Sequence, residues 1–158
     1  MQKILLYYKF TPVKDPETVK LWQKTLCDSL NLRGRILVSR QGLNGTVGGE
    51  MEDLKKYIKE TKKFPGFKDI VFKWSDGGRE DFPRMSVKHR RELVGFQNSE
   101  DEIQVDEKGV VGGGKHIKPR EVHEMIEKYG DDVVFFDGRN EHEAKIGKFK
   151  NAVVPNTN

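Results

Sequence analysis

The pattern of apolar positions predicts a strand and then a helix at the start of the chain. Residues 4–10 are almost continuously apolar, which is typical of a buried strand. Asp15 and Pro16 suit a helix start, because aspartate caps free backbone amides and proline fits the first turn. Helical spacing then continues to about residue 31, at Val19, Trp22, Leu26 and Leu30.

Predicted strands and helices continue to follow one another up to residue 74. The pattern predicts a strand at 35–39, a turn and strand at 42–48, a helix from Met51 that ends before Pro65, and a strand at 69–74. Asn44-Gly45 is the reason for the turn, because this pair favours the positive backbone angles of tight connections.

The resulting order, β-α-β-β-α-β, is the ferredoxin-like (acylphosphatase-like) arrangement of an α+β fold. We expect two helices to cover one face of a four-stranded antiparallel sheet. Residues 85–96 are predicted to continue as an extended segment, which leaves the other face open or partly covered. This first domain spans residues 1–96.

A linker and a second unit are predicted after this domain. Residues 97–115 are polar, acidic and glycine-rich, with a short strand possible at 103–105. Residues 116–158 predict a helix that stops at Gly130, a buried strand at 132–137, a short helix at 141–146 and a further strand starting at 152. About 45 residues are too few to close an α/β domain, so we expect an incomplete one.

The charge of the chain is uneven. Residues 1–96 have a net charge of +8 and residues 97–158 of −4, within an overall +4. A basic front half indicates an anionic partner, with nucleic acid first, although it can also serve solubility alone. The single cysteine, Cys27, excludes an internal disulfide framework and an all-cysteine zinc site. Without a membrane-length apolar run or a signal-peptide pattern, we expect a cytoplasmic protein that does not enter a membrane.

Four ordered motifs resemble the rhodanese-related tRNA uridine hydroxylases. Residues 42–49 (GLNGTVGG) are similar to the family signature GINGTV, and residues 82–94 (FPRMSVKHRRELV) to FPRLKVKVRKEIV. Residues 137–143 (DGRNEHE) and 146–152 (IGKFKNA) resemble DVRNDYEYEIGHFKGA, the opening of the rhodanese domain in that family. The resemblance covers roughly residues 3–96 and 115–157.

The resemblance implies a ferredoxin-like domain followed by the start of an α/β rhodanese domain. In bacterial members it implies oxygen-dependent 5-hydroxylation of the wobble uridine of tRNA. The implied catalytic cysteine lies in a loop after the strand that would follow Val154, and the sequence ends before it. We therefore expect no catalytic residue and no cofactor in these 158 residues, and no activity from them alone.

The densest basic run is the first candidate for contact with RNA. Lys88, His89, Arg90 and Arg91 could neutralise several phosphates. Side chains alternate in a strand, so Lys88 and Arg90 would share one face and His89 and Arg91 the other. A solvated edge strand is the alternative interpretation. Weaker candidates for the same surface are Lys9, Arg35, Arg40 and Arg84, with Phe10 and Phe82 as possible stacking or core residues.

Other residues have a structural and a functional interpretation. Asn44 and Gly45 could line a ligand site beneath the sheet, but turn geometry alone accounts for the pair. Cys27 falls beside the apolar stripe of its helix, where we expect inert packing. By resemblance, Asp137 and Arg139 would support the rhodanese active-site loop through an ion pair or hydrogen bonds.

Two further patterns predict no site. Residues 109–115 fit the first part of a phosphate-binding loop but lack the following Ser or Thr, which favours a linker. The four histidines match no standard metal spacing, so we expect no metal.

Several functions fit the sequence. The leading hypothesis is the N-terminal part of a tRNA-modifying enzyme, in which the first domain holds tRNA. The alternatives are a non-catalytic RNA-binding module and a sulfurtransferase-type rhodanese fragment. An acyl-phosphate hydrolase shares the fold, but residues 10–15 lack its glycine-rich loop with an arginine. The oligomeric state cannot be read from the sequence.

Overall fold

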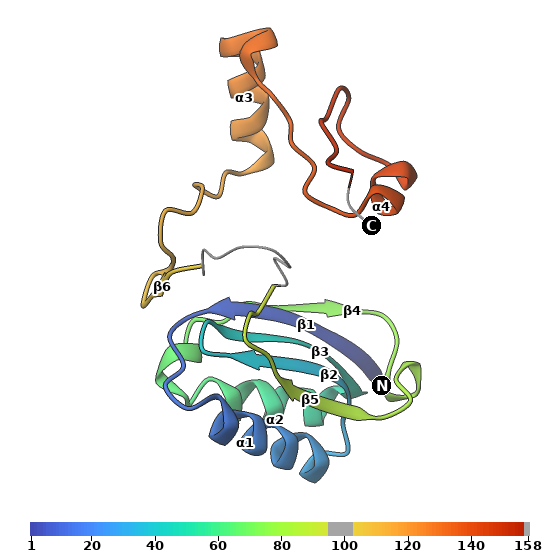
Figure 1. Ribbon diagram of the computed structural model, residues 1–158. Helices are drawn as coiled ribbons and strands as arrows, with labels where there is room; N and C mark the ends of the chain where they lie inside the picture. The colour runs from blue at the N-terminus through green and yellow to red at the C-terminus, as the bar shows by residue number, and fades with distance from the viewer. Residues whose placement is uncertain (95–102, 157–158) are drawn as a thin grey trace. The chain divides into compact units, whose positions relative to one another are not determined.

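The chain forms two compact units, Met1–Gly113 and Gly114–Asn158. A computed structural model describes residues 1–94 and 103–156 (Figure 1). The boundary between the units falls within the stretch of residues 97–115 that the sequence analysis interprets as a linker.

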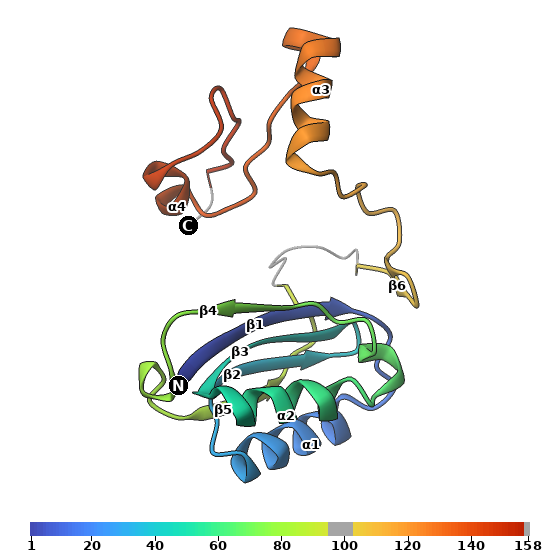
Figure 2. The same cartoon turned by 180° about the vertical axis from the view of Figure 1, so that it is seen from behind.

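The first unit is a five-stranded sheet with two helices on one face (Figures 1 and 2). Its elements are β1 (Gln2–Phe10), α1 (Pro16–Ser29), β2 (Arg33–Ser39), β3 (Gly42–Glu50), α2 (Met51–Thr61), β4 (Phe72–Ser75) and β5 (Met85–His89). The strand order is β4-β1-β3-β2-β5. The first four strands are antiparallel neighbours, which confirms the ferredoxin-like β-α-β-β-α-β prediction.

The segment that begins at Met85 adds a fifth strand to the predicted four-stranded sheet. It joins the sheet as β5, which pairs in parallel with β2 from Gly34↔Met85 to Val38↔His89. The extended conformation predicted for residues 85–96 is confirmed for Met85–His89, which add a strand at the edge of the sheet. Residues 95 and 96 lie outside the described residues. A small hairpin, β6 (Val105–Asp106) and β7 (Gly109–Val110), follows in the same unit.

The turn predicted at Asn44-Gly45 is wrong. Both residues lie within β3, where Asn44 pairs with Tyr8 and Leu37. The connection between β2 and β3 is made by Arg40 and Gln41 instead. Gly45 does not have a positive φ, so turn geometry is not the reason for a glycine there.

Close packing explains Gly45. A Cβ atom at this position would lie 2.3 Å from the hydroxyl oxygen of Tyr7, the neighbouring residue on β1. The Tyr7 hydroxyl is hydrogen-bonded to that of Tyr57 on α2, and Tyr57 donates to Oε1 of Gln23 on α1 at 2.5 Å. Glycine therefore leaves room for a buried polar chain that joins the sheet to both helices.

Apolar side chains fill the space between the sheet and the helices, around the buried hydrogen bonds of Tyr7 and Tyr57. Burial in this core raises the pKa of both tyrosines, so the two phenols stay neutral. The fully buried members of this core include Leu5, Ile36, Val38, Leu43, Val47, Leu54 and Phe67. Because strand residues alternate, the same register turns the other half of the strand side chains to the opposite face.

The second unit has less regular structure. Its helices are α3 (Pro119–Tyr129) and α4 (Glu141–Ile146), and Gly130 follows α3 with a φ of 52°. Both helices were predicted, α4 with the same bounds. The buried strands predicted at 132–137 and from 152 are reduced to one parallel bridge, Phe136↔Val153. The Phe136 side chain is 68% exposed.

None of the helices in the described part of the chain has the length and apolar character needed to cross a lipid bilayer.

Candidate nucleic-acid interface

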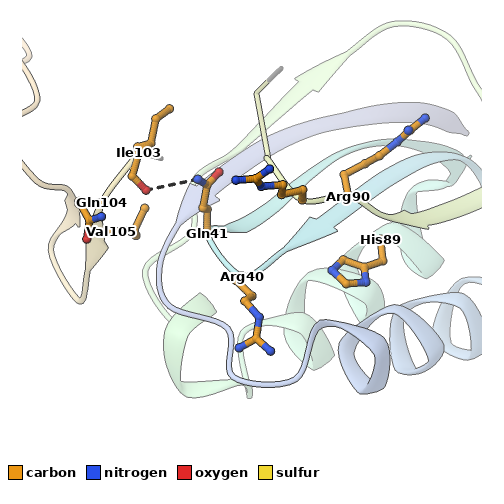
Figure 3. A pocket seen from close by; sticks show the side chains of 8 residues that line it. Arg40, Gln41, His89, Arg90, Ile103, Gln104 and Val105 are labelled. Atoms are coloured by element: carbon orange, nitrogen blue, oxygen red, sulfur yellow. Dashed lines mark hydrogen bonds between the residues drawn. The ribbon is translucent and has the colours of Figure 1, made fainter. Parts of the chain in front are cut away.

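A basic pocket lies where β2 and β5 end (Figure 3). Its volume is about 460 Å³. The turn after β2 contributes Arg40 and Gln41, the end of β5 contributes His89, and Arg90 follows directly. The remaining lining residues are Arg91, Ile103, Gln104 and Val105. Parallel pairing of β2 with β5 brings these cations together, because both strands end on the same side of the sheet.

Gln41 holds the wall of this pocket in place. Its side chain is buried, its Nε2 donates to the carbonyl oxygen of Ile103 at 3.3 Å, and its Oε1 accepts from the amide of Leu93 at 3.0 Å. Figure 3 shows the Gln41 side chain directed toward Ile103. The sequence analysis missed this residue, because a glutamine in a turn gives no signal of burial.

Side chains at the end of β5 alternate as predicted. His89 lies on the helical side, where its Nδ1 is 2.8 Å from Oε1 of Glu17 on α1. Hydrogen bonds from Lys20 and then His89 lower the pKa of Glu17. Figure 3 shows Arg90 directed away from the helices, and its amide donates to the carbonyl of Val38 at 2.8 Å. Arg90 thus continues the open face of the sheet.

Three predicted RNA-contacting residues share that open face. Across the sheet, Lys88 on β5 pairs with Leu37 on β2, and Leu37 pairs in turn with Asn44 on β3. Arg35, two residues before Leu37 on β2, pairs with Ser86 on β5. Because paired residues lie on the same side of a sheet, Arg35, Lys88 and Arg90 project to the side away from the helices. Lys73 on β4 belongs to the same face through its pairing with Leu6. We refer to Arg35, Lys73, Lys88 and Arg90 as the open-face cations.

The other predicted cations do not belong to this group. Arg84 lies before β5, six residues from Arg90, which is roughly 20 Å along an extended chain. Lys9 faces the helical side and pairs with Asp69 at 2.8 Å. Arg40 lines the basic pocket at the turn. The structure therefore brings Lys88, Arg90 and the pocket arginines together at one end of β5 and separates Lys9 from them. Arg84 lies at the other end of β5, close to Arg35, because its carbonyl accepts from the amide of Gly34 at 3.3 Å.

Three of the open-face cations differ in their partners from several lysines of the helices. On α1 and α2, Lys20, Lys55 and Lys56 each pair with an acidic residue three positions away at 2.8–2.9 Å. Arg35, Lys88 and Arg90, by contrast, form no ion pair with any carboxylate in residues 1–94 or 103–156. Cations without partners on a sheet face leave their charge available to an external anion.

The segment after β1 does not offer a phosphate cradle. The Thr11 amide donates to the carbonyl of Gln41 and the Val13 amide to the carbonyl of Arg40, both at 2.9 Å. Pro12 between them has no N–H. The amides of Thr11 and Val13 are therefore already used within the fold and do not face an external anion.

Cys27 is inert in this structure. Its side chain is fully buried between the helices and the sheet, and burial raises its pKa to about 12. Inert packing is confirmed, because a thiol with this pKa carries almost no thiolate near neutral pH. Among the described residues, no three of His, Cys, Asp and Glu gather into a group that could hold a metal ion.

In the second unit, Asp137 and Arg139 form a two-point ion pair. Arg139 donates from Nε to Oδ1 at 2.9 Å and from its guanidinium terminus to Oδ2 at 2.6 Å. The same guanidinium nitrogen donates to the carbonyl of Gly147 at 2.6 Å. The hydrogen bonds from Arg139 lower the pKa of Asp137 to about 2. The pair thus connects the residues after the Phe136 bridge to the end of α4.

The first unit, a helix-backed sheet with the core order β4-β1-β3-β2, defines an acylphosphatase-like domain with a basic sheet edge. Residues 2–93 match the UPF0176 acylphosphatase like domain. The chain belongs to this family.

Curated relatives match almost the whole chain. It is 64% identical over 153 residues to the tRNA uridine(34) hydroxylase of Corynebacterium glutamicum ATCC 13032, covering 97% of this chain and 49% of the relative. It is 61% identical over 156 residues to the protein of that name from Corynebacterium efficiens, covering 99% and 50%. The chain thus spans about half the length of these relatives.

Among solved structures, full-length HypF in its phosphate- and nucleotide-bound form is similar to 59% of this chain. The match covers 13% of that protein, at 15% sequence identity and with a TM-score of 0.43.

Proposed function

We propose that this chain is the N-terminal part of a tRNA uridine hydroxylase and that its first unit holds the tRNA. The reaction is oxygen-dependent 5-hydroxylation of the wobble uridine, in the cytoplasm. Two findings support this proposal: the two relatives named tRNA uridine(34) hydroxylase are 64% and 61% identical to this chain, and the sheet has a basic edge.

The observation that carries the binding role is a set of cations without ion-pair partners in the described part of the chain. Arg35, Lys88 and Arg90 lie on one face, and the basic pocket adjoins it. RNA binding through such groups releases counterions from the phosphates, so affinity should fall steeply with salt. We do not place the hydroxylation reaction in these 158 residues, because their one thiol, Cys27, is buried and protonated.

A salt-dependent titration of tRNA tests the proposal. In the double variant Lys88→Ala/Arg90→Ala, we expect weaker binding and a slope of log affinity against log salt that is smaller by about two, because each cation neutralises one phosphate. Fluorescence anisotropy of labelled tRNA between low and moderate salt provides the measurement.

The matched control removes two cations elsewhere. Lys59 on α2 and Lys68 after it are exposed and have no ion pair with a described residue. Lys59→Ala/Lys68→Ala changes net charge by the same amount, so it corrects for long-range attraction. Equal decreases in the two double variants would refute a specific role for the open face.

A further inference from the structure

The open face of the sheet also presents an exposed aromatic side chain. Tyr8 on β1 is 57% exposed, whereas its neighbour Tyr7 is buried and hydrogen-bonded to Tyr57. The hydroxyl of Tyr8 has no hydrogen-bond partner in the described part of the chain. The ring of Phe10 lies 6.4 Å from it, edge to face, and supports it from one side. Exposure of a large ring on a flat sheet leaves one of its faces free for stacking.

Asn44 lies beside Tyr8 in the same row of the sheet. The register runs Tyr8↔Asn44↔Leu37↔Lys88 across four neighbouring strands. The side-chain amide of Asn44 forms no hydrogen bond with any described residue, so both its donor and its acceptor are available. Strands are spaced by about 4.8 Å, so Lys88 lies roughly 14 Å from Tyr8.

The charge around this aromatic position is of one sign. The neighbouring row runs Lys73↔Leu6↔Thr46↔Arg35↔Ser86. Neither row contains an acidic residue. Cations therefore flank Tyr8 and Asn44 toward both edges of the sheet. A surface with a free ring, a free amide and flanking cations complements an unpaired nucleotide, whose base stacks while its phosphates meet the charges.

We propose that Tyr8 and Asn44 bind an unpaired base of the tRNA anticodon loop. This inference rests on the proposed function and adds the part of the tRNA that the open face recognises. Tyr8 stacks on the base, Asn44 bonds to its edge, and Lys73, Arg35 and Lys88 contact the adjoining phosphates. A duplex cannot use this arrangement, because its bases are stacked on one another and shielded from the sheet.

The test compares an anticodon stem-loop RNA with a blunt RNA duplex of equal charge. For Tyr8→Ala in the full chain we expect roughly tenfold weaker stem-loop binding, the order of one base–aromatic stack, with unchanged duplex binding. Tyr8→Phe keeps the ring and should bind within about twofold of wild type. Tyr129→Ala removes a comparably exposed ring of α3 (49%) and serves as the matched control.

The possible results separate this inference from the proposed function. If Tyr8→Ala leaves stem-loop binding unchanged while Lys88→Ala/Arg90→Ala weakens it, the stacking role is refuted and tRNA binding stands. If wild type binds neither RNA, both fail. An unchanged affinity together with a change in self-association would refute base stacking and show that the face packs against a second copy of the chain. Circular dichroism of each variant checks that the fold is retained.

Discussion

Substitution of Gly45 by alanine tests the most important packing contact in the sheet. The new Cβ would lie 2.3 Å from the Tyr7 hydroxyl oxygen and 2.4 Å from its ring carbon, well inside contact distance. The ring cannot move away freely, because its hydroxyl is bonded to Tyr57 and Phe72 packs against it at 4.9 Å. Either the ring shifts or the buried hydrogen-bond chain opens.

The expected cost follows from these two responses. Overpacking a core costs about 1–3 kcal/mol, and a buried hydroxyl left without a partner costs about 1–3 kcal/mol more. We expect Gly45→Ala to lower the free energy of unfolding by about 2–6 kcal/mol. An ordinary strand position with free space around it would give the opposite sign, because alanine is favoured over glycine in a strand by roughly 0.5–1 kcal/mol.

Urea unfolding followed by tryptophan fluorescence measures this cost. Trp22 and Trp74 both lie in the first unit, so the signal reports that unit alone. With a slope of about 1–3 kcal/mol per molar urea, the midpoint should fall by roughly 1 M or more. Asn44→Ala, next in sequence but on the open face, is the control and should change stability by less than about 0.5 kcal/mol. An unchanged or higher midpoint for Gly45→Ala would refute the packing argument.

Two further predictions concern ionisable groups. Cys27 should not react with a thiol reagent in the native chain at about pH 7–8 but should react fully in denaturant, because burial raises its pKa to about 12. Fast labelling of the native chain would contradict this prediction. Sulfurtransferase turnover by these residues alone would contradict it as well. The Asp137 carboxyl should titrate near pH 2 by nuclear magnetic resonance, and Arg139→Lys should raise that midpoint. Because this pKa is lowered in the folded state, the ion pair stabilises the second unit above about pH 4, and its contribution disappears as pH falls through about 2. A midpoint near the ordinary aspartate value of about 4 in the unaltered chain would show that the pair does not persist in solution.

Local patterns were sufficient for much of the fold. Capping by Asp15 and apolar spacing located α1, and Glu141–Ile146 was predicted with its observed bounds. The alternation of Lys88 and His89 across β5 also follows from strand geometry alone. These features depend on residues within a few positions of one another, and short-range rules describe such residues well.

Partners distant in sequence decided the rest. Residues 4–10 are apolar at nearly every position, so nothing in the pattern distinguishes buried Tyr7 from exposed Tyr8; only the helices above one face do. The Asn44-Gly45 pair suggested a turn, yet Gly45 is required by a tyrosine 38 positions away in the chain. The basic pocket exists because β5 pairs in parallel with β2 and brings Arg90 beside Arg40. The sequence by itself determined which segments form helices and strands, whereas the pairing of distant strands determined which side chains share a surface.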